Sequence, residues 1–218
     1  MKKYIVTTAL MSAGLILSQN ASAELFTNPA NKNDVGQFAL GVDYTSSEFT
    51  TIDDSNLPSD FERTIYSATG SYGISDSVDF YATVGVINQT NIDWTVTEGD
   101  GSLFAMGIKG KLTDNTDTNI YGFAQYLRSS EDFNGSELDS SVFSAGAAVG
   151  VDMDALNLYL SAEFLTGTFD FFGLWDEDND DDFVIRTGGS YTVDDFSINA
   201  GLALVGENGF NIGFSKAF

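Results

Sequence analysis

The chain contains no cysteine and no histidine among its 218 residues, and it has only two prolines. Without cysteine it forms neither disulfides nor thiolate metal sites. Without histidine it lacks the general base of hydrolase triads. Paired carboxylates could still act alone, as in glycosidases, but the acidic residues are too numerous to single out one pair. The sequence therefore predicts that the protein is not an enzyme and has no cofactor, no catalytic residues and no resident metal.

Basic residues are scarce. Nine lysines and arginines stand against 32 aspartates and glutamates, which gives a formal net charge of −23. Proteins that bind nucleic acid carry a basic surface, and peripheral proteins of anionic membranes carry basic clusters. The charge balance excludes the first class and argues against the second.

The first 23 residues have the three parts of a secretory signal peptide. Lys2 and Lys3 form the positive start, 4–17 the apolar stretch, and small residues at 21–23 the cleavage site. The apolar run is shorter than the roughly 20 residues that a transmembrane anchor requires. We expect cleavage near Ala23, leaving a mature domain over 24–218.

After residue 23 no apolar run approaches the length of a membrane-spanning helix, so insertion into a membrane requires a closed barrel. Ten segments of roughly ten residues alternate apolar with small or polar residues, a length that lets a tilted strand cross a bilayer. They lie at 35–45, 62–74, 78–87, 102–112, 119–128, 141–151, 155–165, 183–193, 196–205 and 209–218.

The connections alternate in length, with short turns at 75–77, 113–118, 152–154, 194–195 and 206–209 and longer loops at 46–61, 88–101, 129–140 and 166–182. Outer-membrane barrels place short turns in the periplasm and long loops outside. The pattern predicts an all-β fold, a transmembrane antiparallel up-and-down β-barrel of ten strands, with eight strands as the main alternative. A soluble lipocalin-like barrel also alternates with period two.

The last segment ends the chain on Phe218, with Phe214, Ile212 and Phe210 alternating before it. In this respect the mature chain resembles the small outer-membrane barrel proteins of Gram-negative bacteria, the OmpA-barrel/OmpX-like and porin-like group. The resemblance implies integral residence in the cell outer membrane, contact with lipid and lipopolysaccharide, and a terminal signal read by the barrel assembly machinery. Lys216 departs from the family pattern, but a lysine near the interface can extend its ammonium group to water.

If the apolar positions face lipid, the opposite positions face the lumen. This places seven charged residues inside the barrel, namely Asp43, Arg63, Asp79, Lys109, Lys111, Glu163 and Arg186. The other inward positions are mostly small, such as Ala39, Gly41, Ser67, Thr69, Ser71, Ser144, Gly146, Asn199, Gly201 and Ala203. The segment at 119–128 is apolar on both sides and cannot be oriented.

These inward residues allow two interpretations. Ion pairs and hydrogen bonds between them could simply hold a small barrel together, because unpaired charge in a narrow lumen is costly. They could instead line a pore, since eight strands are just filled by side chains and ten leave more room.

The acidic residues gather in the predicted outer loops, most densely at 176–182. This run lacks the glycine and the distal glutamate of an EF-hand loop, so it offers at most weak binding of divalent cations. An acidic entrance concentrates cations near a pore mouth. The sequence therefore leaves two functions open: a narrow cation-preferring channel, and a non-conducting structural or adhesion-type barrel that acts through its loops. A monomer is expected because a closed barrel has no free edge.

Overall fold

A computed structural model of the protein describes residues 28–29, 33–52, 58–91, 97–113, 118–133, 136–171, 175–178, 182–205 and 208–218. The predicted signal peptide lies outside these residues. Within the part of the chain that the structure describes, no helix is long and apolar enough to cross a membrane.

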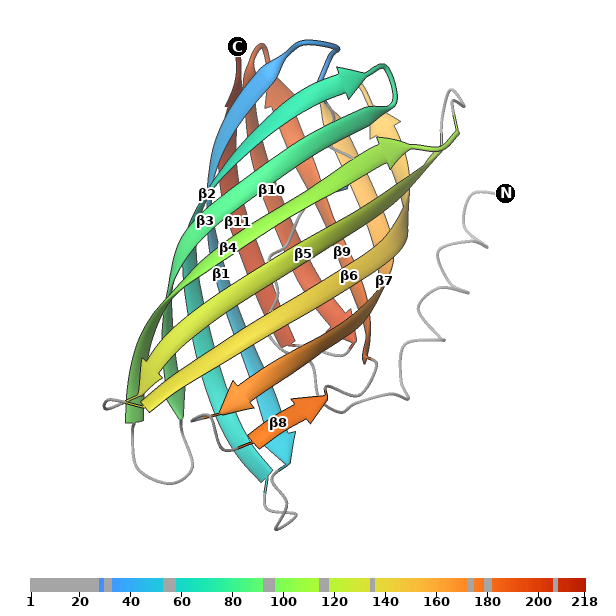
Figure 1. Ribbon diagram of the computed structural model, residues 1–218. Coiled ribbons are helices and arrows are strands. Elements are labelled where there is room, and N and C mark those ends of the chain that lie inside the picture. Colours follow the sequence, from blue (N-terminus) through green and yellow to red (C-terminus); the bar gives the residue numbers. More distant parts are fainter. Residues whose placement is uncertain are drawn as a thin grey trace.

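The described chain consists of antiparallel β-strands (Figure 1). Their bounds are β1 Phe38–Ile52, β2 Pro58–Ser75, β3 Val78–Asn91, β4 Thr97–Lys111, β5 Asn119–Phe133, β6 Ser136–Met153, β7 Leu156–Phe171, β8 Trp175–Asp178, β9 Asp182–Val193, β10 Phe196–Val205 and β11 Asn208–Ala217. The short β8 pairs only with β7, at the end of the barrel that lies opposite the C-terminus. The other ten strands correspond one to one to the ten predicted segments.

The ten strands close into a barrel because β1 pairs with β11 and β6 pairs with β7. A path of paired residues that leaves β7 at Leu156 and follows the ladder once round through β9 returns to β7 at Thr168, twelve residues further along. Such a stagger requires the strands to tilt by about 40° from the barrel axis, and the tilt is visible in Figure 1. The predicted fold class and strand count are confirmed.

The outer surface of the barrel is apolar. Along β1, for example, the side chains of Leu40 and Val42 point outward and are half exposed. Ala39, on the opposite face of the same strand, points into the lumen and is buried. Large apolar side chains point outward in this way on all ten barrel strands. A closed ladder with an apolar exterior satisfies every requirement for residence in a bilayer, because no backbone polar group is left to face lipid.

The structure also orients the strand that the sequence left open. In β5, Ile120 and Tyr126 are exposed on the outer surface, while Tyr121, Gln125 and Leu127 are buried in the lumen. The residues of β5 are large on both sides, so hydrophobicity alone carries no period-two signal here.

The long loops were predicted too long. β1 continues to Ile52 and pairs there with Pro58 of β2, and β5 continues to Phe133 opposite Ser136 of β6. The predicted loops at 46–61, 88–101, 129–140 and 166–182 are therefore largely strand. Beyond the bilayer a ladder needs no apolar outer face, so serine, threonine and acidic residues continue the pairing without the alternation that sequence analysis detects.

Of the predicted short turns, those at 75–77 and 194–195 lie within about a residue of their predicted places, and the one predicted at 152–154 lies at 154–155. Residues 114–117 and 206–207, in the other two predicted turns, lie outside the described residues. Asp154 and Asp194 begin the two-residue connections between β6 and β7 and between β9 and β10. Both have left-handed backbone conformations, with φ of 51° and 53°, which aspartate tolerates better than most residues.

The end of the chain completes the ladder. The backbone N–H of Phe218 donates to the carbonyl of Phe38 at 2.8 Å. The Lys216 ammonium, which departs from the family pattern, lies 5.0 Å from the ring centroids of both Phe196 and Phe218. A cation in this position is stabilised by the ring faces.

The apolar outer wall generates a test of membrane placement. Val84 points outward in the middle part of β3, whereas Val193 points outward beside the short turn after β9. Lysine on the lipid face costs about 2–4 kcal/mol at the bilayer midplane and about 0–1 kcal/mol near the interface. We expect Val84→Lys to lower the free energy of unfolding in lipid vesicles by the larger amount and Val193→Lys by the smaller. Equal costs would contradict this placement.

Candidate functional site: the barrel lumen

All seven charged residues assigned to the lumen by their spacing face the interior of the barrel. Asp79, Glu163, Arg63, Arg186 and Lys109 are 0–9% exposed. Asp43 and Lys111 are half-buried. The structure brings six of these residues together in three separate groups, and the seventh, Lys111, is the last residue of β4.

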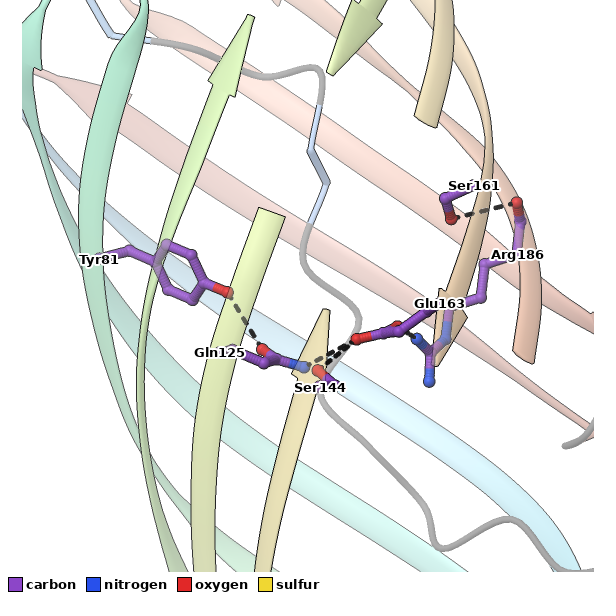
Figure 2. Close-up of polar contacts among 6 residues, drawn as sticks. All are labelled: Tyr81, Gln125, Ser144, Ser161, Glu163 and Arg186. Atoms are coloured by element: carbon purple, nitrogen blue, oxygen red, sulfur yellow. Dashed lines mark hydrogen bonds and ion pairs between the residues drawn. The ribbon is translucent and has the colours of Figure 1, made fainter. Parts of the chain in front are cut away.

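The first group is centred on Glu163 of β7 (Figure 2). Its carboxylate forms an ion pair with Arg186 of β9 and accepts hydrogen bonds from Ser144 Oγ at 2.5 Å and Gln125 Nε2 at 3.4 Å. Gln125 Oε1 in turn accepts from the Tyr81 hydroxyl at 3.1 Å. The network crosses the lumen from β3 to β9 and satisfies a buried charge with an opposite charge and neutral donors, as a low-dielectric interior requires.

The second group joins Arg63 of β2 to Glu131 of β5. Arg63 Nε also donates to Gln89 Oε1 at 2.9 Å, and Ser129 Oγ donates to Glu131 at 3.3 Å. Sequence reasoning missed Glu131 because it fell in a predicted loop. The available signal was Arg63 itself, since a buried arginine requires a carboxylate partner.

The third group lies near the end of the barrel that carries the short turns. Asp79 of β3 and Lys109 of β4 are register partners. Asp43 of β1 fits against Gly213 of β11, where any Cβ atom would overlap its carboxylate oxygen. Asp79 and Lys109 also bind residues that precede β1: Asp79 Oδ2 accepts from the Asn33 backbone N–H at 2.8 Å, and Lys109 Nζ donates to the Asn28 carbonyl at 3.2 Å. Nothing in the sequence pattern indicated that residues before β1 enter the lumen.

An apolar collar also faces the lumen, and the sequence analysis did not foresee it. Seven neighbouring strands, β2 to β7 and β9, each contribute one aliphatic side chain that is 0–4% exposed, namely Ile65, Ile87, Leu103, Leu127, Val142, Leu165 and Val184. The parity that places the charged residues inside also places six of these seven inside, but the sequence analysis named only charged and small residues there. Leu127 lies on β5, the strand whose orientation was left open.

The remaining wall of the lumen is lined by small residues. Strands β10, β11 and β1 are neighbours in the barrel, and their inward positions include Asn199, Gly201, Ala203, Gly213 and Gly41. Of these, Gly41, Asn199 and Ala203 retain accessible surface together with the adjacent Asp43, whereas Gly201 and Gly213 are buried. The lumen is therefore asymmetric, with a packed wall on one side and a thin wall on the other.

The acidic run at 176–182 is only partly described. Its first residues belong to β8, and 179–181 lie outside the described residues. Over the described parts of the chain, no group of three or more acidic, histidine or cysteine side chains could hold a metal ion. Weak binding of divalent cations at this run stays a prediction.

No protein-family model matches the sequence, and no curated protein matches it. Solved structures do match the fold. An outer membrane channel from Pseudomonas putida F1 has a TM-score of 0.56 at 9% identity, covering 89% of this chain and 100% of that one. The translocator domain of the autotransporter NalP from Neisseria meningitidis has a TM-score of 0.51 at 10% identity, covering 85% and 90%. The protein has the fold of outer-membrane β-barrels. Its apolar exterior is the kind of surface that a barrel in a bilayer requires.

The buried ion pair of Arg186 and Glu163 generates a stability test with an internal control. Removing one partner of a buried pair leaves an uncompensated charge and costs about 3–5 kcal/mol. Arg128 and Asp139 form an exposed pair at 3.7 Å, of a kind that contributes about 0–1 kcal/mol. We expect Arg186→Ala to lower the free energy of unfolding by the larger amount and Arg128→Ala by the smaller, measured by urea unfolding in vesicles.

The double variant Arg186→Met/Glu163→Met removes both buried charges and should recover most of the lost stability. Similar losses for Arg186→Ala and Arg128→Ala would show that the lumen is wet enough to screen the Arg186–Glu163 pair.

Proposed function

We propose that this barrel is a narrow, cation-preferring channel and that the conformation described here is its closed state. The observation that carries the proposal is the asymmetry of the lumen. Ten strands enclose more space than the eight that side chains just fill, and the wall formed by β10, β11 and β1 adds little side-chain volume. Its inward residues Gly41, Asn199 and Ala203, together with Asp43, keep accessible surface. A water path along this wall would admit ions and very small solutes.

Charge supports the selectivity that we propose. The Arg63–Glu131 and Arg186–Glu163 pairs are neutral overall. The group of Asp43, Asp79 and Lys109 carries one excess negative charge, which Lys111 on the same inward face of β4 offsets. The selectivity therefore rests on the charge of the whole chain, which is −23, because negative charge around a pore entrance attracts cations and repels anions.

A second candidate is a non-conducting structural or adhesion-type barrel. It is favoured by the pairing of both buried arginines and by the apolar collar, because such a lumen stabilises the barrel without any flow. In that case the acidic end of the long strands would carry the function, and the lumen would be silent in electrical recordings.

We further propose that the protein is a monomer in contact with outer-membrane lipid and lipopolysaccharide, inserted by the barrel assembly machinery. The closed ladder supports this, because all ten barrel strands are paired on both sides and leave no edge that requires a partner.

Recordings in planar bilayers under a salt gradient test the channel. The refolded mature protein should give discrete conductance steps with a cation-selective reversal potential. Asp43→Asn should weaken that selectivity, because it removes a carboxylate from the small-residue wall. Asp154→Asn, the same chemical change at an exposed turn outside the lumen, should leave it unchanged. Folded, inserted protein without steps would favour the non-conducting barrel, and anion selectivity would overturn the electrostatic argument.

A further inference from the structure

Of the described residues that precede β1, Asn28, Pro29 and Asn33 lie in the lumen near the short-turn end. Asn33 is 8% exposed and Pro29 is buried. Asn33 is held twice: its backbone N–H donates to Asp79 Oδ2, and its side-chain Nδ2 donates to Ser71 Oγ, both at 2.8 Å. Closer to the N-terminus, the carbonyl oxygen of Asn28 accepts a hydrogen bond from Lys109 Nζ at 3.2 Å. Asn28, Pro29 and Asn33 are called the N-terminal latch below.

A tight turn directs the latch into the barrel instead of away from it. Gln37 N–H donates to the Asp34 carbonyl at 3.0 Å, and the Asp34 N–H donates to Gln37 Oε1 at 3.0 Å. Gly36 adopts a φ of 77°, which glycine alone adopts without strain. The turn is fastened to β2, because the Gly36 N–H donates to the Gly73 carbonyl at 2.9 Å and the Gly73 N–H donates to the Gln37 carbonyl at 3.0 Å.

The close fit between the turn and β2 depends on Gly73. A Cβ atom at this position would overlap the carbonyl oxygen of Asp34. The turn at 34–37 therefore packs closely against β2 at Gly73 and is held in one place on the barrel wall.

The partners of the latch include charged residues of the lumen. Asp79 and Lys109 belong to the charged group at this end of the lumen, and each is hydrogen-bonded to the latch. The latch thus lies against the charged group and is held by residues of β2, β3 and β4. Its contacts are hydrogen bonds and not apolar packing alone, and water can replace hydrogen bonds of this kind when the segment leaves.

We propose that the N-terminal latch is an intramolecular plug that closes the channel at its short-turn end and that its release opens the pore. This inference rests on the proposed channel function. It assigns the closed state to a named segment of the chain and not to the apolar collar.

Cysteine cross-linking tests the plug, because the natural chain has no cysteine. Asn33→Cys with Ser71→Cys places two thiols where a hydrogen bond now joins the side chains. Asn33→Cys with Ser190→Cys is the matched control, since Ser190 faces the lumen from β9, four strands away from β2 around the barrel. We expect the first pair to form a disulfide in outer-membrane vesicles and the control pair to form none. Failure of the first pair, or equal cross-linking of both, would overturn the docked latch whatever the barrel conducts.

Conductance then tests the role of the latch. With the Asn33–Ser71 disulfide formed, the time spent in open steps should fall by roughly tenfold, and reduction should restore it. Asn33→Pro, which removes both donors of Asn33, should raise the open fraction above that of the natural protein. Openings that are equal in the oxidised and reduced states would overturn the plug while leaving the channel intact. A cross-linked protein that is silent in both states, together with a silent Asn33→Pro variant, would overturn the channel itself.

Discussion

The requirement that every backbone N–H and C=O in a bilayer be paired governs the rest of this structure. It forces the sheet to close, and closure at ten strands with a stagger of twelve residues sets the tilt and the width of the lumen. The pleat then sends alternate side chains outward to lipid and inward to a confined space. The lumen must accommodate polar residues whose charges cannot be hydrated as in bulk water, which explains why Arg63 and Arg186 each have a carboxylate partner.

Ten strands enclose more space than the eight that side chains just fill. Aliphatic residues, tyrosines and ion pairs occupy the wall from β2 to β9, whereas Gly41, Gly201 and Gly213 face the lumen from β1, β10 and β11. Asn33 and Asn28, which precede β1, enter the lumen and bind Asp79 and Lys109. A packed wall, a thin wall and an inserted segment together suit a narrow pore that is closed at rest. They suit a wide, permanently open porin much less well.

Period-two alternation predicted the barrel, the strand count and the inward position of all seven charged residues, because lipid on one side and water or polar groups on the other impose opposite demands on neighbouring residues. The alternation of apolar and polar residues gave no signal where the two faces of a strand do not differ in this way. Beyond the bilayer the strands continue without alternation, which hid Glu131 in a predicted loop. Within β5, large residues on both sides concealed the orientation. The entry of Asn28 and Asn33 into the lumen depends on hydrogen bonds between distant residues, which no local pattern reveals.

In the proposed channel the inward face of β10 borders a water path while its outward face meets lipid. Single cysteines at Asn199, Ala200, Leu202 and Ala203 in membrane-embedded protein, treated with a small water-soluble thiol reagent, would test it most directly. A lumen with a wet small-residue wall predicts labelling at Asn199 and Ala203 and protection at Ala200 and Leu202. Protection at all four positions would show that the wall is dry and the barrel sealed, and labelling at Ala200 and Leu202 would contradict the membrane orientation of the barrel.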